Sequence, residues 1–516
     1  MRTTDQHTPH SPSPALAAPA VPDTGQLGAP YAEAVLRHAG RDWLRLNVPG
    51  HAATPGSDLA GFFGAKITAL DFPPLLDGID LGPDTPLDRA LELAAEAWGA
   101  RRTWFLTNGA SQGNQIASMV APALGRTLVV QRSVHSSVID GLVLSGMDAV
   151  FVRPSVDPGQ GIAHGVTASD VAAALERTPD AAAVYVVSPS YFGAVADVRA
   201  VADAAHAAGV PLIVDEAWGS HFGFHPALPA SALSLGADLV TSSTHKLAGS
   251  LTQSAMLHLA QGPFADLLEP LVDRAFRLVQ STSASALLTA SLDLARRRLV
   301  TGAGATGDGV RAADRVRSAV RALGRFTVVS DGFHRFPDIV GADPLRIAID
   351  TRAGGITGHE ARRRLFRDHQ IMVEVATDAA VVAVIGAGSA PDTDRFVEAL
   401  HTLPSPLTEP PTSPPTGPLT GPGGAGGALR LPEPGATKLT AREAFLSPTR
   451  VVAAEEAVGR ISADTLAAYP PGIPNVLPGE VVTAEVVRFL QRTAAAPNGH
   501  VRGALDPGVT RLRVVA

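Results

Sequence analysis

Strand-like and helix-like stretches alternate along residues 100–260, and this alternation limits the fold more than any other feature of the chain. The strand-like stretches are short, apolar and rich in β-branched residues, at 127–131, 149–152, 183–188, 211–215 and 238–241. Ala-rich helical stretches separate them, as at 168–177 and 198–206. This repeat predicts an α/β fold, with a mostly parallel sheet covered by helices on both faces. The near-continuous apolar runs agree, because such strands are buried on both sides.

Beyond residue 300 the pattern changes, which indicates further domains. An Arg-rich helix is expected at 310–324, a strand at 346–350, a helix at 358–369 and a strand at 371–375. A segment rich in Pro, Gly and Thr follows, and such a composition cannot pack a core. We therefore expect a disordered tail at 1–30, a large domain at 31–300, a small α+β domain at 301–402, a linker at 403–429 and a C-terminal domain at 430–516.

The composition excludes several classes of protein. The chain has no cysteine, so disulfides, thiolate metal sites and cysteine nucleophiles are ruled out. A net charge of −7 argues against nucleic acid as the main partner. No run of about 18 apolar residues is present, and the N-terminal segment lacks the compact apolar core of a signal peptide. We expect a cytoplasmic protein without a membrane or nucleic-acid partner.

Lysine is rare, and base composition explains the low count. The chain has three lysines among its 42 Lys and Arg residues, namely Lys66, Lys246 and Lys438. A guanidinium keeps its proton at neutral pH, whereas a lysine amine can lose it and form a Schiff base. Lys246 follows a predicted strand in a hydroxyl-rich segment, while Lys66 lies in an apolar stretch and Lys438 just beyond the linker. Lys246 is therefore the first candidate to carry an aldehyde cofactor.

Four polar clusters lie at predicted strand ends, where α/β sheets bind ligands. Residues 107–114 open a helical run and either offer free N–H groups to a phosphate or form an ordinary helix cap. Asp215 either pairs with a protonated ring nitrogen or caps a turn. Lys246 is either a Schiff-base residue or a solvated loop lysine. His135 either stacks on a flat ring or is an ordinary loop residue. Together, the clusters supply every group that a pyridoxal-phosphate site requires.

On these residues, the chain resembles the Orn/Lys/Arg decarboxylase family of pyridoxal-phosphate enzymes, which have the aspartate aminotransferase fold (fold type I). The most specific motifs are Ser-Thr-His-Lys followed by Thr-Gln, and Tyr-Pro-Pro-Gly-Ile-Pro. The resemblance is to the short form of the family, without its N-terminal wing domain. The matching stretches run in family order from about residue 40 to 485, at 47–51, 107–114, 132–137, 188–193, 214–219, 242–253, 281–283, 469–474 and 478–480.

The resemblance implies roles for particular residues. Lys246 would carry the cofactor, Asp215 would pair with its pyridine nitrogen, and both would act in catalysis. His135 would stack on one face of the ring, and Ala217 would pack against the other. The phosphate would be held by Ala110 (through its backbone), Ser111, Gln112, Ser243 and His245. Ser283 would reach the phosphate of a neighbouring subunit, since sites of this family form at a dimer interface.

The implied reaction is decarboxylation of a basic amino acid, namely arginine, lysine or ornithine, to the corresponding amine and carbon dioxide, with Lys246 or His245 returning a proton to Cα. Glu480 is the first candidate for the distal cation of the substrate, with Glu374 and Glu216 as alternatives. No metal is expected. Two other classes stay open: a different fold type I pyridoxal-phosphate reaction, such as transamination or aldol cleavage, and a catalytically silent relative.

The chain departs from the family pattern at four positions. The family often has lysine at the positions of Ala52 and Ser136. It often has proline and tyrosine at the positions of Ala284 and Ala286, near the expected dimer interface. These changes bear on the identity of the substrate more than on cofactor binding.

Overall fold

The computed structural model describes residues 25–404, 431–469, 473–496 and 499–516. Residues 1–24 of the expected tail, 405–429 of the expected linker and 470–472 of the Tyr-Pro-Pro-Gly-Ile-Pro motif lie outside the described residues.

The last residues that we assigned to the tail are structured, so that assignment was too long. Gly25–Leu27 forms a 3-10 turn, and helix α1 (Pro30–Ala39) already begins at Pro30. The buried guanidinium of Arg296 causes this, because it donates hydrogen bonds of 2.7 and 2.6 Å to the carbonyl oxygens of Gln26 and Gly28.

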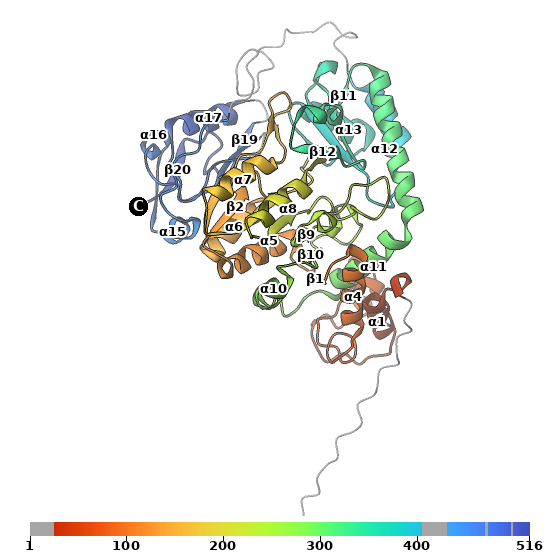
Figure 1. Ribbon diagram of the computed structural model, residues 1–516. Coiled ribbons are helices and arrows are strands. Elements are labelled where there is room, and N and C mark those ends of the chain that lie inside the picture. The colour runs from red at the N-terminus through yellow and green to blue at the C-terminus, as the bar shows by residue number, and fades with distance from the viewer. Residues whose placement is uncertain (1–24, 405–430, 470–472, 497–498) are drawn as a thin grey trace, which may run out of the picture.

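A seven-stranded sheet forms the centre of the molecule (Figure 1). Its order is β1 (Arg102–Leu106), β10 (Ala255–Leu259), β9 (Leu239–Ser242), β8 (Leu212–Asp215), β6 (Ala181–Val187), β2 (Thr127–Gln131) and β3 (Asp148–Val152). The strands from β9 to β3 run parallel, whereas β10 is antiparallel to both of its neighbours. This architecture confirms the predicted α/β fold.

Both faces of the sheet are buried, because alternate side chains of each strand join different apolar clusters. In β2, Val130 packs in one cluster with residues of α5, α6 and α10, whereas Val129 packs in the other with residues of α7 and α8. The helices span α5 (Gly109–Val120), α6 (Ser136–Ser145), α10 (Ala265–Val279), α7 (Ala168–Glu176) and α8 (Val198–Ala207). The predicted helices at 168–177 and 198–206 thus agree with the structure to within a residue or two.

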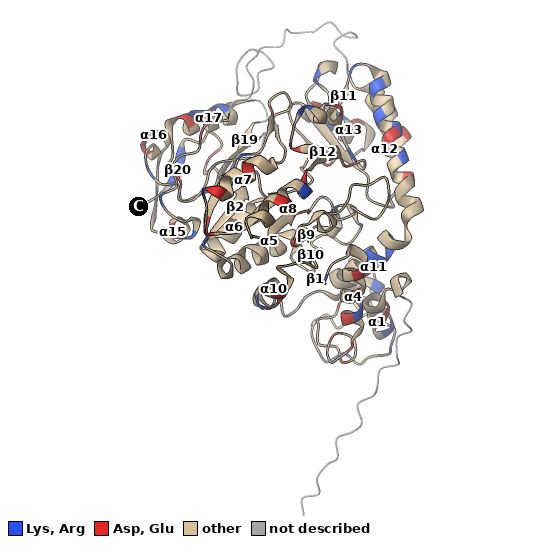
Figure 2. Cartoon of the chain, viewed as in Figure 1, with Lys and Arg blue, Asp and Glu red and all other residues tan. Residues whose placement is uncertain are grey.

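A four-stranded antiparallel sheet forms a second unit, in the order β11 (Thr327–Val328), β13 (Arg346–Asp350), β15 (Ala380–Val384) and β14 (Val375–Ala376). Its helices are α12 (Ala303–Leu323), α13 (Gly358–His369) and α14 (Thr393–Thr402). The helix α12 starts earlier than predicted and carries charges of both signs along its length (Figure 2).

The strand predicted at 371–375 was largely wrong. The reason is the end of α13, where Gln370 takes a left-handed backbone conformation and the N–H of Ile371 bonds to the carbonyl of Leu365 at 2.9 Å. The backbone is thereby committed to closing the helix, and the strand β14 begins only at Val375.

An N-terminal group of helices packs beside the large sheet, and a C-terminal unit lies on the opposite side of it from α12 (Figure 1). The first group comprises α1, α2 (Asp58–Phe63), α3 (Ala65–Ala69), α4 (Pro86–Trp98) and α11 (Ala286–Thr301). The C-terminal unit has its own apolar cluster and comprises α15 (Ala441–Leu446), β16 (Thr449–Ala453), α16 (Ala454–Ala457), β17 (Leu466–Tyr469), β18 (Pro474–Val476), α17 (Ala484–Ala495), β19 (His500–Arg502) and β20 (Arg511–Val515).

Two further pairs of short strands complete the described part of the chain, β4 (Val156–Asp157) with β5 (Ile162–Ala163) and β7 (Ala194–Ala196) with β12 (Ile339–Ala342). Within the ranges described above, no helix has both the length and the apolar character needed to cross a membrane.

Candidate active site

The strands β8 and β9 bring Asp215 and Lys246 to the same edge of the sheet. Asp215 is the last residue of β8, and β9 leads directly into the short helix α9 (Thr244–Leu247), which carries Lys246. The two strands pair in parallel, with Asp215 opposite Thr241. Because carboxyl ends of parallel strands meet at one edge, the expected carboxylate and amine lie together there.

The amine of Lys246 is sheltered from water. Its Nζ atom lies 4.1 Å from the centre of the Trp218 ring, which follows β8. Burial is the largest cause that lowers the pKa of Lys246 from 10.5 to about 8. The charges of Asp215 and Glu374 raise this pKa, and the charge of Arg346 lowers it. A lysine with this pKa is partly neutral near pH 7 and is suited to act as a nucleophile.

The side chain of Arg346 packs against the ring of Trp218 as well. Its guanidinium carbon lies 4.1 Å from the centre of the Trp218 ring, and Nη1 donates a 2.6 Å hydrogen bond to the carbonyl of Tyr191. The side chain is fully buried and lies 3.8 Å from the carboxylate of Asp343. Neither Trp218 nor Arg346 was among the expected site residues, because only the tertiary fold brings β13 against the loop that follows β8.

Asp215 is held by a buried network centred on Asn114. The amide of Asn114 donates to Oδ2 of Asp215 at 2.8 Å and to Oγ of Ser137 at 3.0 Å. The hydroxyl of Tyr185 donates to Oδ1 of Asn114 at 2.9 Å. The backbone N–H of Ala217 donates to the other oxygen of Asp215 at 3.0 Å. These donors fix the orientation of the carboxylate.

His135 stands at the start of α6 and belongs to the same site. Its Nδ1 accepts a 3.2 Å hydrogen bond from the backbone N–H of Ser137, so the neutral ring carries its proton on Nε2. Burial lowers the pKa of His135; the charge of Asp215 opposes this, and the charges of Lys246 and Arg502 add to it. The structure therefore brings together His135, Asp215 and Lys246.

The helix α5 presents its N-terminus as a possible anion site. The side chain of its N-cap residue, Asn108, makes no capping hydrogen bond, and a Cβ added to Gly109 would meet no atom within 4 Å, so there is open space at this end. The N–H groups of Asn108 and Gly109 bond to Oε1 of Gln112 and to the carbonyl of Gln253. A Cβ on Gly113 would lie 2.7 Å from the side chain of Thr241, so this glycine lets α5 approach β9 closely. Ala110 and Ser111 lie in this first turn, and uncapped N–H groups there attract anions.

Three of the expected phosphate ligands have partners within the chain. The amide of Gln112 is buried and donates to Oε1 of Gln280 at 2.7 Å. Ser243 and His245 pair with each other at 3.3 Å, and Nδ1 of His245 lies 3.0 Å from the carbonyl of Ser254. This carbonyl can only accept, so Nδ1 of His245 carries a proton.

Ser283 lies apart from these groups in the described chain. It is exposed in the loop between α10 and α11, and its hydroxyl pairs with that of Ser281 at 3.2 Å. Its expected role concerns a neighbouring subunit, which the single chain leaves untested.

Glu480 is already committed to an internal partner. Its two carboxylate oxygens accept hydrogen bonds of 2.7 and 2.8 Å from the guanidinium of Arg132, and both side chains are about 5% exposed or less. Leu477 adds a backbone donor at 2.9 Å. A substrate cation would have to displace this buried bidentate pair, so the geometry weighs against the expected role of Glu480. The prediction for Glu480 did not take Arg132 into account, because the two residues lie 348 positions apart in the chain.

Of the two alternatives, Glu374 faces the site and Glu216 does not. Glu374 is exposed, accepts a 3.1 Å hydrogen bond from the hydroxyl of Tyr191, and raises the pKa of Lys246 by its charge. Glu216 is buried and accepts the backbone N–H of Ala232 at 2.8 Å. Burial holds the pKa of Glu216 well above its usual range.

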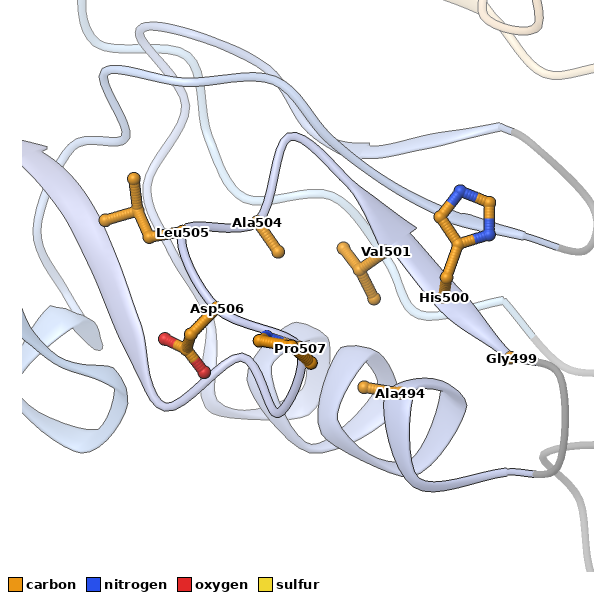
Figure 3. Close-up of a pocket in the computed structure, with 8 residues that line it drawn as sticks. All are labelled: Ala494, Gly499, His500, Val501, Ala504, Leu505, Asp506 and Pro507. Atoms are coloured by element: carbon orange, nitrogen blue, oxygen red, sulfur yellow. The ribbon is translucent and has the colours of Figure 1, made fainter.

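A hollow of about 390 Å³ lies in the C-terminal unit, away from these residues (Figure 3). It is lined by Ala494, Gly499, His500, Val501, Ala504, Leu505, Asp506 and Pro507, and includes none of the expected site residues. Among the described residues, no group of three or more His, Cys, Asp and Glu side chains is arranged to hold a metal ion.

The fold and the site together define the class of protein. Solved structures of lysine decarboxylases from Francisella novicida (LdcF) and Escherichia coli (the constitutive enzyme) superpose with TM-scores of 0.76 and 0.75 over 95% of this chain, at 19% and 20% identity. The superpositions cover 81% and 82% of the two lysine decarboxylase chains. The large domain thus has the fold of these decarboxylases, as the resemblance to fold type I predicted.

The chain belongs to the Orn/Lys/Arg decarboxylase family. The family's major domain matches residues 29–334, and its C-terminal domain matches residues 428–500. Arginine decarboxylases from Bacillus subtilis and Halalkalibacterium halodurans are 32% and 34% identical over 95% of this chain and 98% of theirs. The resemblance inferred from the motifs is confirmed, and membership makes the chain an amino acid carboxy-lyase.

Proposed function

We propose that this protein decarboxylates a basic amino acid with pyridoxal phosphate as its cofactor. The observation that carries the proposal is the convergence of a sheltered lysine, a buried and fixed carboxylate and a neutral imidazole at one edge of the sheet, beside an uncapped helix N-terminus. These are the groups that this cofactor requires of a protein.

The residues present fit the cofactor. Lys246 would carry it. Asp215, fixed through both oxygens, would hold a proton on the pyridine nitrogen. His135 and Ala217 would cover the two faces of its ring. The phosphate would lie at the N-terminus of α5, where open space adjoins Gly109, held by Ala110, Ser111, Gln112, Ser243 and His245. Gln112 would have to exchange its present partner for this role.

The protein would contribute orientation and proton transfer to the reaction. When bound, the cofactor supplies a ring that accepts the electron pair left behind as the carboxylate departs as carbon dioxide. The amine of Lys246, with a pKa of about 8, can release and take up a proton near neutral pH. It or His245 would return a proton to Cα of the substrate. The ring of Trp218, 4.1 Å from Nζ, keeps water from the amine.

Glu374 is the group that we propose for the distal cation of the substrate. Its carboxylate is exposed, is oriented by Tyr191 and lies within electrostatic range of Lys246. Unlike Glu480, it forms no ion pair in the described part of the chain, although its charge reaches the buried guanidinium of Arg346. Relatives named arginine decarboxylase match nearly the whole chain, which makes arginine the first substrate to test.

A homodimer is also part of the proposal. Several large apolar side chains are exposed along the N-terminal part of the single chain, and exposed apolar side chains that form a contiguous patch mark protein–protein interfaces. Those more than half exposed are Leu27, Leu36, Leu44, Leu46, Val48, Phe62, Phe63 and Leu75. A second copy of the chain would cover them and place Ser283 near its neighbour's site. Sedimentation should give twice the monomer mass, and the double variant Leu46→Asp with Phe62→Asp should shift it toward the monomer. The cytoplasm remains the expected compartment.

The decisive experiment measures carbon dioxide release from arginine, lysine and ornithine, with keto-acid formation assayed in parallel. Carbon dioxide without keto acid supports decarboxylation, and keto acid would indicate transamination instead. The variant Lys246→Ala should lose the visible absorbance of bound cofactor and most turnover, whereas Lys438→Ala, at an exposed lysine, should keep both. Asp215→Ala should bind cofactor weakly with almost no turnover, and an unchanged rate would refute its role. A colourless wild-type protein would favour a silent relative.

A further inference from the structure

Arg502, in the C-terminal unit, reaches the start of the helix that carries His135. It ends β19, where its backbone pairs with Ala467 of β17. Its Nη2 donates a 2.9 Å hydrogen bond to Oγ of Ser136, across a separation of 366 residues. Ser136 directly follows His135, so the guanidinium is bonded next to a residue of the proposed site.

The stability of the helix does not explain a cation at this point. The N-terminus of α6 is the positive end of its dipole, and a cation there is unfavourable. Asp140, one turn further along α6, offsets part of this repulsion: burial raises the pKa of Asp140, and the charges of His135 and Arg502 act in the opposite direction. The charge of Arg502 reaches His135 as well. Its placement therefore points to the site.

The residue that accepts this hydrogen bond is itself uncharged, because position 136 is a serine. Its short, neutral side chain leaves room for the guanidinium, and its hydroxyl accepts the hydrogen bond. A positive charge thus stands beside position 136 although residue 136 has none.

We propose that Arg502 is a positioning residue for the decarboxylase site. It brings a positive charge from the C-terminal unit to the start of α6, and its hydrogen bond to Ser136 holds that start and hence the ring of His135. This proposal rests on the function proposed above only in taking His135 to be part of the site.

The charge state of His135 gives the proposal its measurable consequence. The backbone N–H of Ser137 occupies Nδ1, so protonation at that nitrogen would break this hydrogen bond. A nearby guanidinium disfavours protonation further. Removing Arg502 should therefore raise the pKa of His135.

Four variants test this inference. They are Arg502→Gln, Arg502→Lys, Arg502→Gln combined with Ser136→Lys, and Arg450→Gln as the control. Arg450 is an exposed arginine on β16 of the same unit. The first readout is the modification of His135 by diethyl pyrocarbonate as a function of pH, in protein without cofactor, followed by peptide mass mapping. The second is the pH dependence of kcat.

We expect Arg502→Gln to move the titration of His135 and the acid limb of kcat together to higher pH. Arg502→Lys keeps the positive charge, so both curves should stay close to those of the wild type. Adding Ser136→Lys to Arg502→Gln should move both curves most of the way back to the wild-type position. Arg450→Gln should leave both curves unchanged. A His135 titration that is the same in Arg502→Gln as in the wild type would overturn the proposal. So would a Ser136→Lys substitution that restores nothing. A wild type that releases no carbon dioxide from any basic amino acid would refute the proposed function but leave the labelling result interpretable.

Discussion

The lowered pKa of Lys246 leads to a prediction that can be measured without substrate or cofactor. The shift from 10.5 to about 8 corresponds to about 3.4 kcal/mol at roughly 1.36 kcal/mol per unit. Burial is its largest cause, and the ring of Trp218, 4.1 Å from Nζ, is part of that shelter. Opening the shelter should raise the pKa of Lys246.

The substitution Trp218→Ala makes that test, and two effects oppose each other in it. Water admitted to the amine favours the charged form and raises the pKa. Loss of the aromatic face removes a cation–π attraction of about 0.5–2 kcal/mol, which lowers it. The effect of burial is larger than the cation–π attraction, because burial is the largest cause of the net shift of about 3.4 kcal/mol and also offsets the charges of Asp215 and Glu374. The pKa of Lys246 should therefore rise in Trp218→Ala. Trp218→Phe keeps a ring and should change the pKa much less.

The rarity of lysine makes the assay simple. Cofactor-free protein is labelled with a trace of an amine-specific reagent at pH values on both sides of 8, and the extent at each lysine is read by mass spectrometry. Lys66 and Lys438 are exposed and serve as references in the same tube. At pH 8 the neutral fraction of Lys246 would fall by up to about 150-fold if its pKa returned fully to 10.5. Coincident labelling curves for Lys246 and the exposed lysines in the wild type would refute the reasoning, as would no change in Trp218→Ala.

Two further predictions concern stability. Arg132→Met leaves the carboxylate of Glu480 buried without its partner and should destabilise the protein by about 3–5 kcal/mol, while adding Glu480→Leu should recover much of the loss. Urea midpoints of the wild type, Arg132→Met, Glu480→Leu and the double variant give the coupling energy. Strictly additive effects of the two substitutions would contradict the prediction. Burial lowers the pKa of His258 from 6.5 to about 3. Between these two pH values the histidine is protonated in the unfolded chain and neutral in the folded chain. This group's contribution to stability is therefore complete above pH 6.5 and is lost as the pH falls toward 3, by about 2 kcal/mol between pH 7.5 and 5. His258→Gln should flatten the acid side of the urea-midpoint curve, and an unchanged slope would rule out this cause.

The strands of the parallel part of the sheet could be predicted because burial on both faces makes them continuous apolar runs. The predicted strand at 127–131 matches β2 residue for residue. The strands β1 and β10 were missed. The strand β10 returns antiparallel without a crossover helix and so leaves no strand–helix repeat in the sequence. Local apolarity also misled the prediction at 371–375, where closure of α13 uses the backbone.

The core of the site was predictable for a related reason. Asp215 and Lys246 follow neighbouring parallel strands, so the topology alone brings them together. Trp218 and Arg346 could not be paired in the same way, because their contact joins the loop after β8 to strand β13 of the smaller sheet, and neither residue has a local pattern that indicates it. The bond between Arg132 and Glu480 was invisible for the same reason.

That last bond has a consequence for the order in which the chain is made. N-terminal units of a long protein fold first during synthesis, and Arg132 leaves the ribosome 348 residues ahead of Glu480. Throughout that interval the guanidinium at the end of β2 lacks both its carboxylate and the carbonyl of Pro474, which it later contacts at 3.0 Å. The sheet can be complete while the loop before His135 is still solvated. The nascent chain thus finishes its site only after Pro474 and Glu480 have emerged, so a chain interrupted before them has a folded centre but an unfinished site.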